Sequence, residues 1–226
     1  MHALELAKQQ NNDLTVARIL RRLSDTNRLL ELYEEGVHQA KDALEIYKCF
    51  DDAVEQAICL KDLAFVLIDD GKFDAAEAAI SEAINLIPTN GQDHLACVSY
   101  RVLGDVYRMK GEKEKAIHHF EMALEIASPF DWHDELFWNH LLLAVLFRSW
   151  GEFDESNVHI GHARSHVAHN AYSLGLVTEK QAEVWQQQQR LEDAMSEALR
   201  ALEIFERLGA AGDAERCGDF IRSLSE

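Results

Sequence analysis

The chain has 226 residues, of which 47% are apolar, 11 are glycine and only 2 are proline, so it can bury a sizeable core and is too hydrophobic to be disordered. Its formal charge of −18 argues against broad contact with nucleic acid or an anionic membrane, because the phosphates would be repelled. No apolar run approaches the roughly 20 residues of a membrane-spanning helix, and the first residues lack a signal-peptide pattern, so a cytoplasmic location is the default expectation.

The four cysteines, Cys49, Cys59, Cys97 and Cys217, are widely spaced and form no C-x-x-C motif. This spacing predicts neither a zinc site nor a disulfide framework. We expect reduced cysteines that fill space between helices.

A period of 40 residues runs along the chain. Gly71, Gly111 and Gly151 are each followed by a similar segment, "GKFDAA", "GEKEKA" and "GEFDES". A second recurring segment reads "ALEI" at residue 43, "AINL" at 83 and "ALEI" at 123 and 201. In chain order we expect the tail of an earlier, truncated repeat (1–8), five repeats (9–50, 51–90, 91–130, 131–170 and 171–208) and a capping helix (209–226).

Residues 1–8 read as the end of a repeat, because "ALEL" at residue 3 lies 40 residues before "ALEI" at residue 43. We therefore expect the chain to be the C-terminal part of a larger protein. Its N-terminal edge would then be uncapped, with apolar residues such as Leu4 exposed. Such an edge would allow self-association.

Each repeat has the pattern of two helices. In the third repeat, Val102, Leu103, Val106 and Tyr107 recur at helical spacing before Gly111, and a second apolar series follows it. The glycine supplies the left-handed backbone that ends the first helix. Two short amphipathic helices cannot bury their apolar faces alone, so neighbouring pairs must stack. The sequence predicts an all-α fold, a right-handed α-solenoid of about five helix-turn-helix repeats.

The C-terminal stretch after Gly209 predicts a capping helix. It places Ala214, Cys217, Ile221 and Leu224 along one face and charged residues elsewhere. A helix of this kind covers the apolar face of the last repeat.

The third repeat resembles a tetratricopeptide repeat. The signature positions are occupied by Tyr100, Leu103, Gly104, Tyr107, Ala116, Phe120, Ala123 and Pro129. Gly104 and Ala116 are small enough to let the two helices approach closely, while Tyr107 and Phe120 fill the space around them. In the first repeat, Glu31 stands at the position of the turn glycine.

The 40-residue step is longer than the family's repeat of about 34 residues. The extra length adds about 1.7 turns of helix, and Asp51 or Asp52 with Glu55 offers capping chemistry for it. First helices of this length are similar to those of cell-polarity adaptors, kinesin light chains and the sensor regions attached to signal-transducing NTPases. Fungal proteins of the last type end in a similar way.

The resemblance implies that a partner binds on the concave surface lined by the first helix of each repeat. The inward positions of these helices hold seven of the 22 basic residues, with apolar residues between them. We expect this groove to attract an acidic or amphipathic peptide. The candidate partner-binding residues are Arg21, Arg28, Lys61, Phe65, Arg101, Arg108, Trp138 and Arg148.

Two features of these positions have a second interpretation. Asp25 lies four residues after Arg21 and three before Arg28. These arginines either make the groove basic or are neutralised by the aspartate on their own helix. Asp105 has the same relation to two arginines. Trp138 lies in "FWNHLLLAVLF", which is apolar almost all round, so it either faces a partner or is buried.

His159, His162, His166 and His169 form one stripe along a predicted helix. His162 and His166 have the spacing of a two-histidine metal site, but no acidic ligand lies within the motif. We favour a solvated helix face over metal affinity or a pH response, and expect no metal.

The sequence shows no glycine-rich phosphate loop, no nucleophile elbow and no distinct pair of carboxylates, so we expect no enzyme, no catalytic residue and no cofactor. The leading interpretation is a protein interaction scaffold that takes a peptide in its groove, without nucleic acid or membrane as partner. The alternative is a ligand- or signal-sensing regulatory module of a signal-transducing NTPase, for which an upstream Walker A motif would be the sign.

Overall fold

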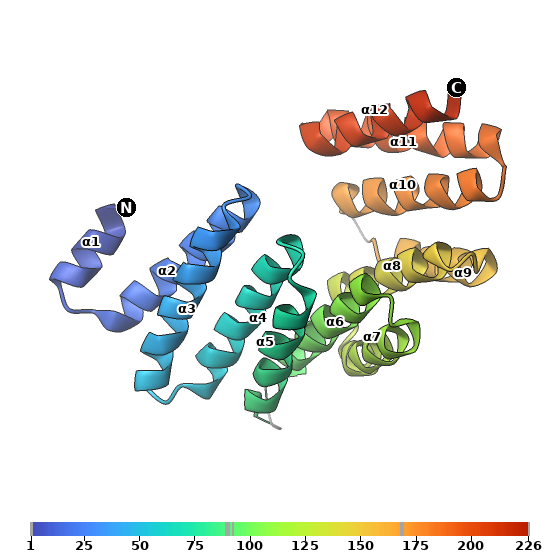
Figure 1. Ribbon diagram of the computed structural model, residues 1–226. Helices are drawn as coiled ribbons and strands as arrows, with labels where there is room; N and C mark the ends of the chain where they lie inside the picture. Colours follow the sequence, from blue (N-terminus) through green and yellow to red (C-terminus); the bar gives the residue numbers. More distant parts are fainter. Residues whose placement is uncertain (1, 89–90, 92, 168–169, 226) are drawn as a thin grey trace. The chain divides into compact units, whose positions relative to one another are not determined.

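The computed structural model describes residues 2–88, 91, 93–167 and 170–225 (Figure 1). Within these ranges the chain forms twelve α-helices and one short 3-10 helix, and it has no strand. The all-α fold predicted from the sequence is confirmed. The helices group into two compact units, Met1–Ile126 and Ala127–Glu226.

Unit 1 begins with α1 and continues with three helix pairs. Its elements are α1 (His2–Gln9), α2 (Asp13–Leu29), α3 (Tyr33–Cys49), α4 (Ala53–Asp69), α5 (Phe73–Leu86), α6 (Asp93–Lys110) and α7 (Lys113–Ala127). The second helix of a pair packs on the first helix of the next, α3 on α4 and α5 on α6. The first helices also contact one another, α2 with α4 and α4 with α6. They therefore line one face of this unit.

Unit 2 holds two helix pairs and a final helix. Its elements are η1 (Ser128–Phe130), α8 (His133–Ser149), α9 (Phe153–Ser165), α10 (Ala171–Gln187), α11 (Leu191–Leu208) and α12 (Ala211–Ser225). Phe137, Val177 and Phe205 meet in its core. Cys217 of α12 is buried in the same core and Ala214 packs against it. The expected capping helix is confirmed.

Tight turns with left-handed backbone recur at the predicted period. Between the two helices of a pair, Gly71, Gly111 and Gly151 have φ values of 72°, 74° and 76°. Glu31 adopts the same conformation, with a φ of 61°, although it carries a side chain that disfavours it. The turn expected at Glu31 is therefore present.

A second set of left-handed residues lies between successive pairs. Asn11, Asp51 and Asp131 have φ values of 50°, 53° and 51°. The side chain of Asp52 accepts a hydrogen bond from the Glu55 backbone amide at 3.1 Å and caps α4. Of the two predicted capping residues, Asp52 is the cap and Asp51 makes the turn.

Small residues set the spacing within the pairs. A Cβ placed on Gly104 would lie 2.8 Å from the Phe120 ring, closer than packed carbon atoms approach. Ala116 is fully buried in the same pair. The close approach predicted for the third repeat is confirmed. In unit 2, a Cβ placed on Gly175 would likewise lie 2.7 Å from the Phe205 ring.

The N-terminal helix differs from the expectation. α1 contacts α2, and Leu4 and Ala7 are buried, with Leu4 only 9% exposed. The prediction of an exposed Leu4 is wrong, because this side chain faces the chain's own next helix. Leu6 remains 47% exposed. Across the described residues, every helix is too short or too polar to span a membrane.

Candidate functional site

The eight sequence-predicted residues all lie on first helices, but they fall into two units. Six lie in unit 1, on α2 (Arg21, Arg28), α4 (Lys61, Phe65) and α6 (Arg101, Arg108). Trp138 and Arg148 lie on α8 of unit 2. We therefore describe the first-helix face of each unit separately.

Arg21 joins α2 to α4 through two carboxylates. Its Nη1 lies 2.5 Å from Glu55 Oε2 and its Nε donates to Asp62 Oδ2 at 3.0 Å. Burial works to lower the pKa of the half-buried Arg21, but Asp62 and Glu55 outweigh it and the pKa is raised. Arg21 is therefore a charged link between two first helices.

Arg28 makes a second link one step along the same helices. Its Nη1 donates to Asp69 Oδ2 of α4 at 2.8 Å, and its Nη2 donates to Asp25 Oδ1 at 3.0 Å. The guanidinium also lies 5.9 Å from the ring centre of Phe65, and the Lys61 ammonium lies 5.6 Å from it. Phe65 is thus half-buried, and its ring lies close to two cations.

The acidic partners of these arginines are not among the residues predicted from the sequence. Glu55, Asp62 and Asp69 follow one another at intervals of seven residues, which is close to two helical turns and puts them on one face of α4. They face Arg21 and Arg28, which are also seven residues apart. This facing pair of rows, which we term the charge ladder, makes the α2–α4 face charge-balanced instead of basic.

On α6, Arg108 pairs with a residue of its own helix. Arg108 Nε donates to Asp105 Oδ1 at 2.7 Å, the neutralisation that the second interpretation of the sequence describes. Asp25 pairs with Arg28 in the same way, whereas Arg21 turns to α4. Arg101 is half-buried on the same helix.

A pocket of about 290 Å³ opens between α4 and α6. Its lining combines apolar side chains with one ammonium group and one imidazole: Ile58, Lys61, His94, Leu95 and Val98. Of these, Lys61 is a candidate binding residue predicted from the sequence, whereas His94 and Leu95, at the start of α6, are not. The pocket is a part of the unit 1 face where an apolar side chain and a carboxylate could bind together.

In unit 2, Trp138 is half-buried and packs against the core of that unit. Its ring meets Phe137 edge to face, with the ring centres 5.3 Å apart. Arg148 Nη2 lies 2.8 Å from Glu183 Oε2 and links α8 to α10. The first helices of unit 2 are therefore tied by an ion pair, as those of unit 1 are.

Residues 55–128 match the profile of a protein family described as tetratricopeptide repeat. They span α4 to η1, the part of the chain that contains the pocket and the best-matched repeat. This segment of the chain is therefore of the tetratricopeptide repeat type. No curated protein matches it in sequence.

Solved structures of helical repeat proteins resemble this chain in fold. Aspartyl phosphate phosphatase F from Bacillus subtilis aligns with a TM-score of 0.69 at 13% identity, over 95% of this chain and 61% of its own. A Rap protein complexed with the competence and sporulation factor aligns with a TM-score of 0.66 at 14% identity, over 98% and 72%. Nearly identical repeats of a putative kinesin light chain from Podosopora anserina align with a TM-score of 0.67 at 13% identity, over 85% and 96%.

Proposed function

We propose that this protein is a non-enzymatic, cytoplasmic interaction scaffold that binds an amphipathic, acidic peptide segment of a partner on the first-helix face of unit 1. The observation that carries the proposal is the pocket between α4 and α6, which places apolar side chains and the Lys61 ammonium on the face that tetratricopeptide repeats use for binding. An apolar anchor with an adjacent charge is the arrangement expected of a peptide site.

The ion pairs on this face allow a carboxylate of a bound peptide to take the place of an aspartate of the chain. Lys61 pairs with Asp62 at 2.9 Å and Arg108 pairs with Asp105, and all four side chains are only partly buried. Ion pairs of this exposure contribute little to stability, about 0 to 1 kcal/mol each. At Arg108 a carboxylate of a bound peptide can therefore replace Asp105 at little cost, whereas Asp62 is also held by Arg21. This is the physical basis for preferring an acidic segment.

The comparisons support binding as the class of function. One similar structure was determined as a complex with the competence and sporulation factor, so a chain of this fold holds a ligand. At 14% identity this likeness supports the fold alone, and the ligand proposed for this chain follows from its own residues.

The test uses a displayed random peptide library, selected on the purified chain, with the selected sequences resynthesised and labelled. We expect the sequences to combine aspartate or glutamate with large apolar residues. Fluorescence anisotropy then gives the affinity for the wild type, for Leu95→Asp and for the double variant Arg101→Glu with Arg108→Glu. We expect each variant to weaken binding at least about tenfold, which corresponds to about 1.4 kcal/mol.

The matched control is Lys41→Glu, a charge reversal on the exposed face of α3. We expect wild-type affinity for this variant, and circular dichroism should show unchanged helix content in all variants. A library that yields no binder, or affinities that Leu95→Asp and the double reversal leave unchanged, would refute the proposed site.

A further inference from the structure

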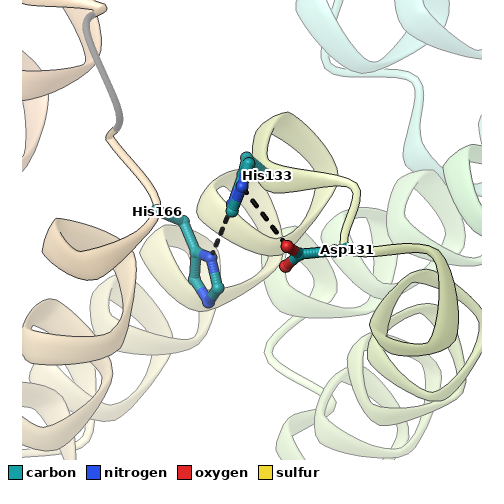
Figure 2. A group of neighbouring side chains, drawn as sticks. All are labelled: Asp131, His133 and His166. Carbon is teal, nitrogen blue, oxygen red and sulfur yellow. Dashed lines mark hydrogen bonds and ion pairs between the residues drawn. The ribbon is translucent and has the colours of Figure 1, made fainter.

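Two histidines and an aspartate from two segments of unit 2 converge beside the start of α8. Asp131 lies in the turn before α8, His133 is the first residue of α8, and His166 follows the end of α9 (Figure 2). The Nδ1 atoms of His133 and His166 are 3.3 Å apart, and His133 Nε2 lies 3.5 Å from Asp131 Oδ2. One ligand atom from each residue lies within 4.8 Å of the other two.

This spacing suits a first-row divalent metal ion. Bonds of about 2.0 to 2.1 Å in a tetrahedral site place two ligand nitrogens roughly 3.3 to 3.4 Å apart. The two Nδ1 atoms already have this separation. Asp131 is exposed, which leaves its side chain room to turn the carboxylate toward them. Imidazole with one carboxylate is a donor set for zinc, nickel or copper, whereas magnesium and calcium prefer oxygen ligands alone.

Further histidines surround His166. The ring of His140 stacks with His166 and His162, at centre distances of 6.0 and 4.9 Å, and its Nδ1 lies 3.1 Å from Nδ1 of His159. Burial, reinforced by neighbouring imidazoles, lowers the pKa of His140 to about 3 and that of His159 to about 4. His166 therefore lies against an imidazole-rich surface of unit 2.

The structure changes the interpretation of the histidine stripe. The pair His162 and His166, four residues apart in the sequence, lacks an acidic ligand within its motif. In the fold, His166 instead meets His133, which lies 33 residues earlier, and Asp131 supplies the carboxylate. His169, the last member of the stripe, lies outside the described residues.

We propose that Asp131, His133 and His166 form a binding site for a divalent transition metal ion such as zinc, with solvent at the remaining coordination position. The bound ion would tie the start of α8 to the end of α9, the two helices of one repeat. The site lies in unit 2, apart from the peptide face proposed on unit 1, so it is an additional function of the chain.

The test titrates zinc chloride into chelator-treated, dialysed protein at about pH 7.5 and follows the heat by isothermal titration calorimetry. We expect one equivalent to bind to the wild type, with a rise in the midpoint of thermal unfolding because the ion binds the folded state. His133→Ala and His166→Ala should each weaken binding at least about tenfold, and Asp131→Asn should weaken it less. Cobalt(II) should give the visible absorption of a tetrahedral nitrogen and oxygen site.

His38→Ala is the matched control, because His38 is an exposed histidine on α3 of unit 1 and should bind no part of the ion. His133 and Asp131 are exposed, so their substitution leaves the core intact, and circular dichroism checks this. Absence of zinc binding by the wild type would overturn the proposal. So would equal affinity of the wild type, His133→Ala and His166→Ala, which would place the ion elsewhere.

Discussion

Arg216 of α12 donates hydrogen bonds to both carboxylate oxygens of Glu179 of α10. Its Nε lies 2.6 Å from Oε1 and its Nη2 lies 3.1 Å from Oε2. Glu179 is only 3% exposed, whereas Arg216 reaches the surface. The hydrogen bonds to Glu179 raise the pKa of Arg216 against the effect of burial. The capping helix is thus held by a charged contact as well as by Cys217 in the core.

We predict that Arg216→Ala lowers the free energy of unfolding by about 1 to 3 kcal/mol, because it leaves a buried carboxylate without its main partner. Urea unfolding followed by circular dichroism measures the change. The control is Arg222→Ala, since Arg222 is exposed and pairs with Asp219 of its own helix. Its loss should cost no more than about 0.5 kcal/mol. Equal effects of the two substitutions would show that the Glu179 contact does not hold α12.

Glu31 occupies a left-handed turn position where the second, third and fourth repeats have glycine. Its φ of 61° is close to the 72° of Gly71, but a side chain makes this conformation costly. We predict that Glu31→Gly raises the free energy of unfolding by about 0.5 to 1 kcal/mol and that Gly71→Ala lowers it by about 1 kcal/mol. Both changes are measured by urea unfolding. Destabilisation by Glu31→Gly would mean that the Glu31 side chain makes a contact that outweighs the backbone strain.

The carboxylate of Glu77 on α5 joins two residues of α6. It accepts hydrogen bonds from Lys110 Nζ at 2.6 Å and from the Tyr107 hydroxyl at 2.8 Å. The bond to Lys110, followed by that to Tyr107, lowers the pKa of Glu77 below its usual value despite partial burial. The folded state therefore binds this proton less readily than the unfolded state.

It follows that the contribution of Glu77 to stability is fully present well above the ordinary glutamate pKa of about 4.3 and is lost as the pH falls through the lower folded-state pKa. We predict that Glu77→Gln destabilises the protein at about pH 7 and that its difference from the wild type shrinks toward about pH 3. Urea unfolding across this range tests it. Glu82→Gln, an exposed change on the same helix, should show neither effect. A difference that stays constant with pH would contradict the prediction.

The fold follows from local rules that a single sequence displays. The recurrence of Gly71, Gly111 and Gly151 marks turns because glycine is the residue that adopts left-handed backbone without strain. The small residue at Gly104 predicts a close helix pair because a side chain there would meet Phe120. A turn glycine and a small packing residue each determine the structure of a single turn or helix pair. Both can therefore be recognised in the sequence.

The candidate site was harder to predict, because its charges and ligands are set between helices. The arginine positions were visible, but whether Arg21 pairs within α2 or across to Asp62 depends on side-chain directions in the stacked fold. The seven-residue spacing from Asp62 to Asp69 was a usable signal. The meeting of His133 with His166 had no such signal, since it depends on how a helix start and a helix end are brought together.

The charge ladder between α2 and α4 bears directly on the proposed peptide. Asp62 and Asp69 form ion pairs with the guanidinium groups of Arg21 and Arg28. An acidic segment that approaches this face therefore meets charges that are already paired. We predict that the double variant Asp62→Asn with Asp69→Asn binds the selected acidic peptides about three- to tenfold more tightly. The affinity should also fall more steeply with salt, because two positive charges are no longer neutralised within the protein.

The control must change the net charge equally without touching the ladder. Asp42→Asn, combined with Glu45→Gln on the same exposed face of α3, does so. Fluorescence anisotropy at two ionic strengths compares the variants. If both double variants tighten binding alike, the effect is one of overall charge, and if neither does, the peptide occupies the pocket at Val98 without reaching the ladder. Only a gain confined to Asp62→Asn with Asp69→Asn would place the peptide's acidic residues beside Arg21 and Arg28.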